Sequence, residues 1–181
     1  DVTYKNGKII VTWTGNDTSG TGIYSREFEI VTGGVKALGN EKLINLTQTS
    51  NQDESDITHL KDGGYVVSWT SLNQDGSNNG VYLQRYNASG VKVGSEQVVN
   101  TYYTNSQSDS IITGLSNGGY VVVWSSTGQD GSGDGVYMQR FGVDGKKLGA
   151  EEQVAESTLS NQNQPSLDAL ENGGFVVSWT G

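Results

Sequence analysis

The chain has 181 residues, of which 33% are hydrophobic and 17% are charged, and it contains 26 glycines, one proline and no cysteine. Glycine at about twice its average frequency and a charged fraction below the usual ~25% argue against helical bundles, while four tryptophans, nine tyrosines and three phenylalanines argue against disorder. The net charge of −9, with scattered lysines and arginines, argues against nucleic-acid partners. The lack of cysteine excludes disulfide scaffolds, thiolate zinc sites and cysteine nucleophiles.

The expected strands begin in an incomplete first copy of a repeat. Lys8 to Trp13 is an apolar strand, followed by strands from Gly22 to Phe28 and from Gly39 to Asn45. The longest wholly apolar run in the chain, Tyr120 to Trp124, is far too short to span a bilayer, so membrane insertion is not expected. Because the chain begins at Asp1 and shows no signal peptide, we expect a mature product or an excised piece.

The next copy is complete and predicts four strands. A short strand from Asp56 to Leu60 leads into the tight turn Asp62-Gly63-Gly64, and a strand that is apolar on both faces follows. The third strand runs from Gly80 to Tyr86 and the fourth from Gly94 to Asn100. The later copies repeat this order, with first strands at Ser110 to Leu115 and Ser166 to Leu170, a third strand at Gly135 to Phe141 and a fourth at Gly149 to Ala155.

The repeat has a period of 55 residues. The segment Gly63 to Trp69 returns at Gly118 to Trp124 and again at Gly173 to Trp179. We therefore divide this single repeat domain, 1–181, into a partial unit 1–54, units 55–109 and 110–164, and a partial unit 165–181.

Four strands in a unit of this length predict an all-β fold, a β-propeller-like array of four-stranded antiparallel blades. A threefold fold, either a β-trefoil or a β-prism, is the alternative. Propellers close with about 4–8 blades, and the chain supplies about three and a third units. We therefore expect self-association, or further blades from a longer chain, to complete the array.

The motifs Gly-Gly-Tyr-Val-Val-Ser-Trp, Gln74-Asp75-Gly76-Ser77 and Gly80 to Tyr86, with Gly94-Ser95-Glu96, resemble a tandem repeat of very large bacterial secreted or surface proteins. In those proteins it often stands beside hemolysin-type (RTX) calcium-binding or cadherin-like modules. The resemblance covers nearly the whole chain, and the first copy departs most because Arg26-Glu27 replaces Gln-Arg. It implies an extracellular module of propeller type and supplies no catalytic motif.

Calcium is the candidate cofactor, because one polar loop recurs in three copies. Its oxygen side chains alternate before a glycine, as in the first half of a calcium loop, although the later acidic ligands are missing. The competing interpretation, which we favour, is a hairpin in which Asp caps its own turn. The candidate metal ligands are Asp17, Ser19 and Thr21, then Asp75, Ser77 and Asn79, then Asp130, Ser132 and Asp134.

Aromatic residues recur within the strands, at Trp13, Trp69, Trp124 and Trp179 and at Tyr24, Tyr82 and Tyr137. They are candidate sugar-stacking platforms of a lectin, but their place inside strands favours packing between blades. Arg85 and Arg140 share a strand face with apolar residues, so we expect packed stems whose guanidinium groups meet a nearby carboxylate or carbonyl.

An enzyme finds little support in the sequence, so we predict that the chain is not an enzyme and assign no catalytic residue. His59 is the only histidine, so the chain offers at most one imidazole. Asp53, Glu54 and Asp56 form a carboxylate cluster of the kind that serves glycosidases, and we interpret it as a solvated turn.

The expected function is surface binding, adhesion or scaffolding by an extracellular or cell-surface repeat module, in which each loop contributes weakly and repetition supplies avidity. A carbohydrate-binding lectin and a structural spacer or filament subunit are the alternatives. The expected partners are further copies or blades and a glycan or other cell-surface ligand, with residues of the ligand site unassigned.

Overall fold

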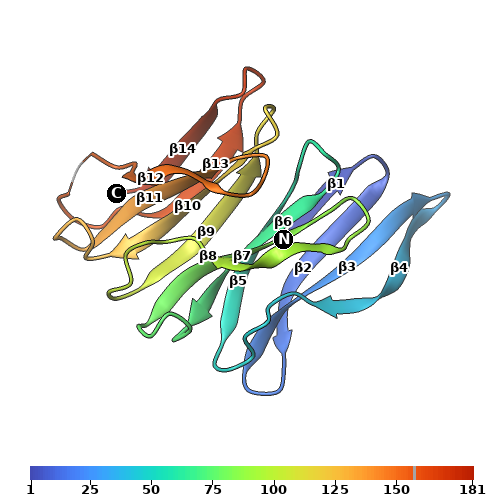
Figure 1. The fold of residues 1–181 in the computed structure, drawn as a ribbon, viewed down its shortest axis with the longest axis horizontal. Helices are drawn as coiled ribbons and strands as arrows, with labels where there is room; N and C mark the ends of the chain where they lie inside the picture. The colour runs from blue at the N-terminus through green and yellow to red at the C-terminus, as the bar shows by residue number, and fades with distance from the viewer. Residues whose placement is uncertain (157) are drawn as a thin grey trace.

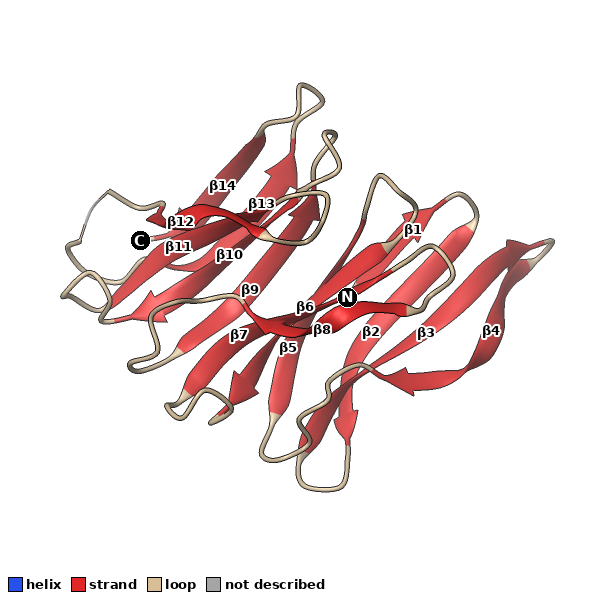
Figure 2. Cartoon of the chain, in the orientation of Figure 1, coloured by secondary structure: helices blue, strands red, loops and turns tan. Residues whose placement is uncertain are grey.

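The computed structural model describes residues 1–156 and 158–181, and every regular element in that part of the chain is a β-strand (Figure 2). The strands pair antiparallel in four sheets, which confirms the predicted all-β class. They are β1 (Val2–Lys5), β2 (Lys8–Asn16), β3 (Thr21–Val31), β4 (Gly34–Leu43), β5 (Gln52–His59), β6 (Tyr65–Leu72), β7 (Asn79–Tyr86), β8 (Lys92–Val98), β9 (Gln107–Gly114), β10 (Tyr120–Thr127), β11 (Asp134–Phe141), β12 (Lys147–Gln153), β13 (Asn163–Ala169) and β14 (Phe175–Thr180). None of the described residues belongs to a helix long and apolar enough to cross a membrane.

Each of the first three sheets is a four-stranded meander in which neighbours in sequence are neighbours in space. They comprise β1 to β4, β5 to β8 and β9 to β12, and the fourth sheet comprises β13 and β14 alone. The sheets follow one another across the molecule in chain order, from blue to red in Figure 1. The strand expected first in each unit therefore lies at one edge of its sheet, and this edge position is the same in every sheet.

The first strands of the second, third and fourth sheets, β5, β9 and β13, begin earlier than predicted, and each contains a bulge near its start. The pairing of β5 with β6 shifts register between Asp53 and Asp56, and Glu54 in the bulge has a φ of 55°. Asp109 in β9 and Gln164 in β13 repeat this backbone conformation, with φ of 54° and 51°. The predicted unit boundaries at 55, 110 and 165 consequently fall inside β5, β9 and β13 rather than between sheets.

The turn between the first and second strands forms as the Asp-Gly-Gly pattern predicts. Asp62 Oδ1 accepts a hydrogen bond from Gly64 N at 2.9 Å, and Leu60 N donates to Gly64 O at 2.8 Å. Gly63 has a φ of 86°, which a residue with a Cβ rarely adopts. A Cβ at Gly64 would lie 2.3 Å from the carbonyl oxygen of Tyr86, so the second glycine is required by space.

Apolar side chains fill the junctions between successive sheets, and the second strands of the two middle sheets, β6 and β10, are buried on both faces. Trp69 and Trp124 are 0% exposed. Trp69 lies in a cluster with Ile10 and Ile23 of the first sheet, and Trp124 lies in a cluster with Val66 of the second. The predicted packing role of the tryptophan series is confirmed at these two positions.

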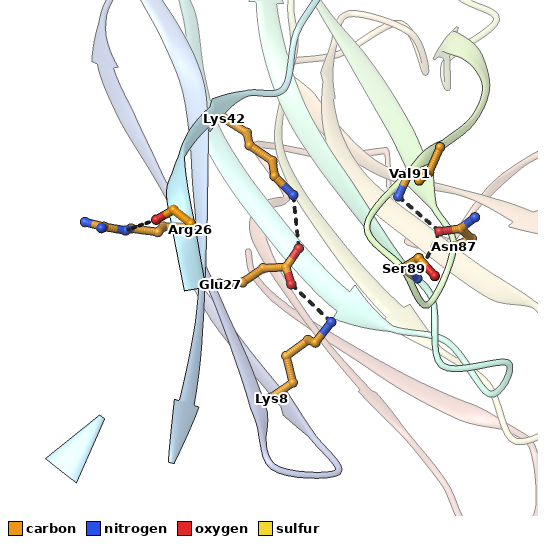
Figure 3. A network of polar contacts seen from close by, with 8 residues as sticks. Lys8, Arg26, Glu27, Lys42, Asn87, Ser89 and Val91 are labelled. Carbon is orange, nitrogen blue, oxygen red and sulfur yellow. Dashed lines mark hydrogen bonds and ion pairs between the residues drawn. The ribbon is translucent and has the colours of Figure 1, made fainter. Parts of the chain in front are cut away.

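A charged side chain of the third strand also marks the junction between the first two sheets. Glu27 Oε2 and Oε1 lie 3.1 and 3.2 Å from the ammonium groups of Lys8 and Lys42 (Figure 3). Burial raises the pKa of Glu27, but the hydrogen bonds and charges of both lysines outweigh it and hold the pKa below its ordinary value. A Cβ at Gly90, in the β7–β8 turn of the second sheet, would lie 2.6 Å from Glu27 Oε1, so this turn approaches closely because it carries a glycine there.

The second junction repeats this arrangement with the opposite charge. Arg85 occupies the position of Glu27 in the next sheet, and its Nη2 lies 3.1 Å from Asp62 Oδ2, as expected for a packed stem whose guanidinium group meets a nearby carboxylate. Gly145 lies in the corresponding β11–β12 turn of the third sheet. A Cβ at this glycine would lie 3.2 Å from Arg85 Nη1, so this turn also approaches the charged side chain closely. Each sheet therefore meets the next through equivalent positions.

Candidate functional site

The bulges of β5, β9 and β13 line one side of a cavity of about 360 Å³, called here the acidic cavity. It is lined by Asp1, Glu54, Ser55, Asp56, Asp109, Ser110, Ile111, Gln164 and Pro165. Three of these residues, Glu54, Asp109 and Gln164, hold the left-handed backbone conformation at equivalent positions of successive sheets. A non-glycine residue in this conformation costs about 1–3 kcal/mol, and such residues cluster at functional sites.

Two of the four carboxylates in the acidic cavity hold neighbouring sheets together. Asp56 Oδ2 accepts a hydrogen bond from Ile112 N of the third sheet at 2.7 Å, and its Oδ1 accepts from Ile57 N at 2.9 Å. Asp1 occupies the equivalent position and reaches Ile57 N of the second sheet at 3.4 Å. Burial raises the pKa of Asp56, and the two backbone hydrogen bonds oppose that rise. These carboxylates position the strands around the cavity.

The other two carboxylates have capacity left for a ligand. Glu54 Oε2 accepts hydrogen bonds from Thr70 Oγ1 at 2.8 Å and from Asp109 N at 3.2 Å, which places this carboxylate beside Asp109. Burial, followed by the negative charges of Glu54 and Asp134, raises the pKa of Asp109. The pair combines a carboxyl group whose pKa is raised with a carboxylate oxygen acceptor beside it.

The interpretation of Asp53, Glu54 and Asp56 as a solvated turn is wrong, because all three lie in strand β5 and two of them line the cavity. The sequence analysis also missed Asp109 and Gln164. The repeat spacing could have identified them, because residues 54, 109 and 164 occupy equivalent positions of successive repeats and all carry polar side chains. The bulge that brings them to one cavity leaves no recognisable pattern in composition.

A second cavity, of about 520 Å³, lies at the opposite ends of the same first strands. Its lining includes two lysines, Lys5 and Lys61, together with His59 and one carboxylate, Glu171, so this end is of mixed charge where the other carries carboxylates. His59 Nδ1 and Thr3 Oγ1 are 3.0 Å apart, and Lys5 Nζ donates to the carbonyl oxygen of Leu60. Burial, together with the charges of Lys5 and Lys8, lowers the pKa of His59.

In each of the three polar loops the aspartate caps its own turn, as the favoured interpretation predicts. Oδ1 of Asp17, Asp75 and Asp130 accepts the backbone N–H of the residue two positions later, at 2.9, 3.1 and 3.0 Å. The other oxygen, Oδ2, is buried in all three and has no hydrogen-bond partner among the residues that the structure describes. The same local structure thus recurs in three successive sheets.

Three of the remaining candidate calcium ligands bond elsewhere, and one of them is Ser77, whose Oγ donates to the carbonyl oxygen of Asn105 at 3.4 Å. Thr21 Oγ1 donates to Asp53 Oδ1 at 2.9 Å, and Asp134 Oδ1 accepts from Thr127 Oγ1 at 2.7 Å. The other predicted positions, Ser19, Asn79 and Ser132, lie in the same loops or at the start of β7. Over 1–156 and 158–181, no group of three or more His, Cys, Asp and Glu side chains is arranged to hold a metal ion. Calcium binding stays a prediction.

No protein-family model and no curated protein sequence matches the chain. Among solved structures, the chain is similar to an endo-arabinase from Bacteroides thetaiotaomicron, with a TM-score of 0.62 and 16% identity over 99% of this chain and 68% of that one. An endo-1,4-β-xylanase from the same organism gives a TM-score of 0.48 at 10% identity, over 99% of this chain and 82% of that one.

The comparison corrects the prediction that the chain is not an enzyme. The endo-arabinase has a similar fold, so the fold gives no ground for setting this chain apart from enzymes. One Gly-x-Ser-x-Gly match, Gly114 to Gly118, spans the end of β9 and the turn to β10, whereas the serine of a hydrolase stands at a turn from a strand into a helix. This context and the single histidine argue against a serine hydrolase, but a carboxylate site needs neither a serine nor a histidine.

Proposed function

We propose that the chain is a saccharide-binding module of an extracellular or cell-surface protein, and that the acidic cavity holds the saccharide. The observation that carries this proposal is the convergence of Glu54, Asp109 and Gln164 from three successive sheets on one cavity. Carboxylate and amide groups are suited to sugar hydroxyls, because a carboxylate accepts two hydrogen bonds and an amide both donates and accepts. Ile111 and Pro165 add apolar surface for a sugar ring.

The wider context of the proposal is a propeller-like array. The order of the sheets, their four-stranded meanders and the cavities at both ends of the first strands support this arrangement. We further propose that the chain belongs with the 55-residue repeats of large bacterial surface proteins that its motifs resemble. Binding at a cell surface then gains avidity from repetition.

The proposal is tested by titrating the chain with arabino-oligosaccharides and xylo-oligosaccharides and following the heat of binding. These ligands are chosen because the enzymes with similar folds are named for such polymers. Asp109→Asn and Glu54→Gln are expected to weaken binding roughly tenfold or more, since each removes a charge-assisted hydrogen bond. Asp144→Asn, at an exposed carboxylate in the β11–β12 turn, is the matched control and is expected to bind as the wild type does.

Equal affinity in all three variants, or no binding of any member of a broad glycan array, would overturn the saccharide site. Loss of binding in Asp144→Asn alone would place the ligand at a different surface.

Glycoside hydrolysis is the second candidate, favoured by the pair Glu54 and Asp109. Glycosidases use one carboxyl group with a raised pKa as a proton donor and a second, ionised carboxylate beside the same bond. The pKa of Asp109 is raised, as the proton donor of such a pair requires, and Glu54 supplies a second carboxylate beside it. Release of reducing ends from arabinan or xylan that falls about a hundredfold in Asp109→Asn would establish hydrolysis, whereas binding without release in the wild type leaves a binding module.

A further inference from the structure

The first sheet has an apolar face that no other described part of the chain covers. The register of β1, β2 and β3 places Val2, Tyr4, Val11 and Trp13 on this face, because Val2 pairs with Val11 and side chains alternate along each strand. Val2 and Tyr4 are 58% and 59% exposed. The opposite face of the same sheet, which includes Ile10, is buried against the second sheet.

The equivalent face is covered in the next two sheets. In the second sheet it carries Tyr65 and Trp69, which pack in one cluster with Ile10 of the preceding sheet. In the third sheet it carries Tyr120 and Trp124, in one cluster with Val66 of the preceding sheet. The cover is thus the same in both cases, namely the second-strand face of the sheet before it.

The fourth sheet carries a free copy of that covering face. Val176 in β14 occupies the position of Val66 in β6, and it is 52% exposed whereas Val66 is fully buried. Its strand neighbours Phe175 and Val177 point the other way and pack against the third sheet. The two free faces at the ends of the row of sheets are therefore the two halves of one interface that recurs inside the chain.

From this complementarity we infer that the chain associates head to tail with a second copy of itself. The β13–β14 face of one copy, around Val176, packs on the first-sheet face of the next copy, around Tyr4 and Trp13. Such a contact joins two different surfaces, so repeated copies form a ring where the rotation between them closes and a filament where it does not. We assign the partner as a second copy because, at both internal junctions, the face equivalent to the free face of the first sheet packs against the second strand of another sheet of the same repeat.

The test measures mass in solution by light scattering over a wide range of protein concentration. The wild type is expected to grow beyond the monomer as concentration rises. Tyr4→Glu and Val176→Glu each place a charge at the centre of one free face, and each alone is expected to remain monomeric. An equimolar mixture of the two variants is expected to form heterodimers and nothing larger, because only one intact pair of faces remains between them.

Val91→Glu is the matched control, since Val91 is 58% exposed in the β7–β8 turn and lies on neither face. It is expected to assemble as the wild type does, and thermal unfolding of all variants shows that each is folded. A wild type that stays monomeric at every concentration would overturn the inference. Dimerisation of Val176→Glu alone would also overturn it, because it would show a contact between two identical first-sheet faces.

Discussion

At the scale of single residues, a buried asparagine and a buried glutamine form a clip in two of the repeats. Asn45 Oδ1 accepts from Ile23 N at 2.8 Å, and its Nδ2 donates to Gln52 Oε1 at 2.8 Å. Asn100 makes the same two bonds, to Val81 N at 2.8 Å and to Gln107 Oε1 at 3.2 Å. Each clip joins the third strand of one sheet to the start of the next sheet.

The third repeat has lost half of this clip. Ala155 stands at the asparagine position, and Gln162 Oε1 is buried without a hydrogen-bond partner among the described residues. Ala155→Asn is expected to restore the clip and to stabilise the chain by about 1 kcal/mol, measured by urea unfolding. Asn100→Ala is the reciprocal control, expected to cost about 1–3 kcal/mol because it leaves Gln107 unsatisfied. A destabilised Ala155→Asn variant would show that the site has closed around alanine.

Asp109 gives a prediction for the dependence of stability on pH. Its pKa is raised in the folded state, so the folded chain holds this proton more tightly than the unfolded chain does. Stability therefore falls as the pH rises from about 4, the ordinary carboxyl range, through the raised pKa. Asp109→Asn removes this loss and is expected to be more stable than the wild type at pH 7, by under about 1 kcal/mol because the site is partly solvated. The two are expected to converge near pH 4, and a variant less stable than the wild type at pH 7 would contradict the account.

At the scale of elements, the tryptophan that recurs in the second strand of each sheet occupies different environments in β6 and β14. Trp69 in β6 is 0% exposed between two sheets, whereas Trp179 in β14 is 40% exposed. Trp69→Ala is expected to cost about 3–5 kcal/mol, because it opens a cavity in the core. Trp179→Ala is expected to cost clearly less, and chemical unfolding of both variants gives the comparison. Equal losses would mean that β14 is packed as tightly in solution as β6.

The strands were predictable because the repeat shows each pattern several times. The tight turn at Gly63 and Gly64 and the apolar second strand follow directly from residue type, and the structure has both. The bulge at Glu54 was not predictable, since nothing in residue type at 54, 109 and 164 signals a left-handed backbone for Glu, Asp and Gln. The acidic cavity was missed for that reason, because only the bulge and the packing of successive sheets bring Asp109 beside Glu54.

At the scale of the whole molecule, the loops and the cavity make separate predictions about ligands. If calcium binds at Asp130 and its equivalents, thermal unfolding is expected to shift upward with calcium and back with EDTA, and Asp130→Ala is expected to reduce the shift. Identical unfolding midpoints with calcium and with EDTA would limit these aspartates to capping their turns. These loops do not line the acidic cavity, but the charge of Asp134 acts on Asp109 in its lining.

The charge distribution also follows the direction of the first strands. Carboxylates line the cavity at their starts, whereas Lys5, Lys61, His59 and one carboxylate, Glu171, line the cavity at their ends. A neutral saccharide is therefore expected to occupy the first cavity, and its site is defined by three strands rather than by one loop.

The central claim is that a saccharide binds where these three strands meet, and an NMR titration tests it most directly. The backbone amide signals of Glu54, Asp109 and Gln164 are expected to shift together, with one common affinity, as an oligosaccharide identified by the binding screen is added. Shifts confined to other surfaces, such as the loops at Asp75 and Asp130, would contradict the claim.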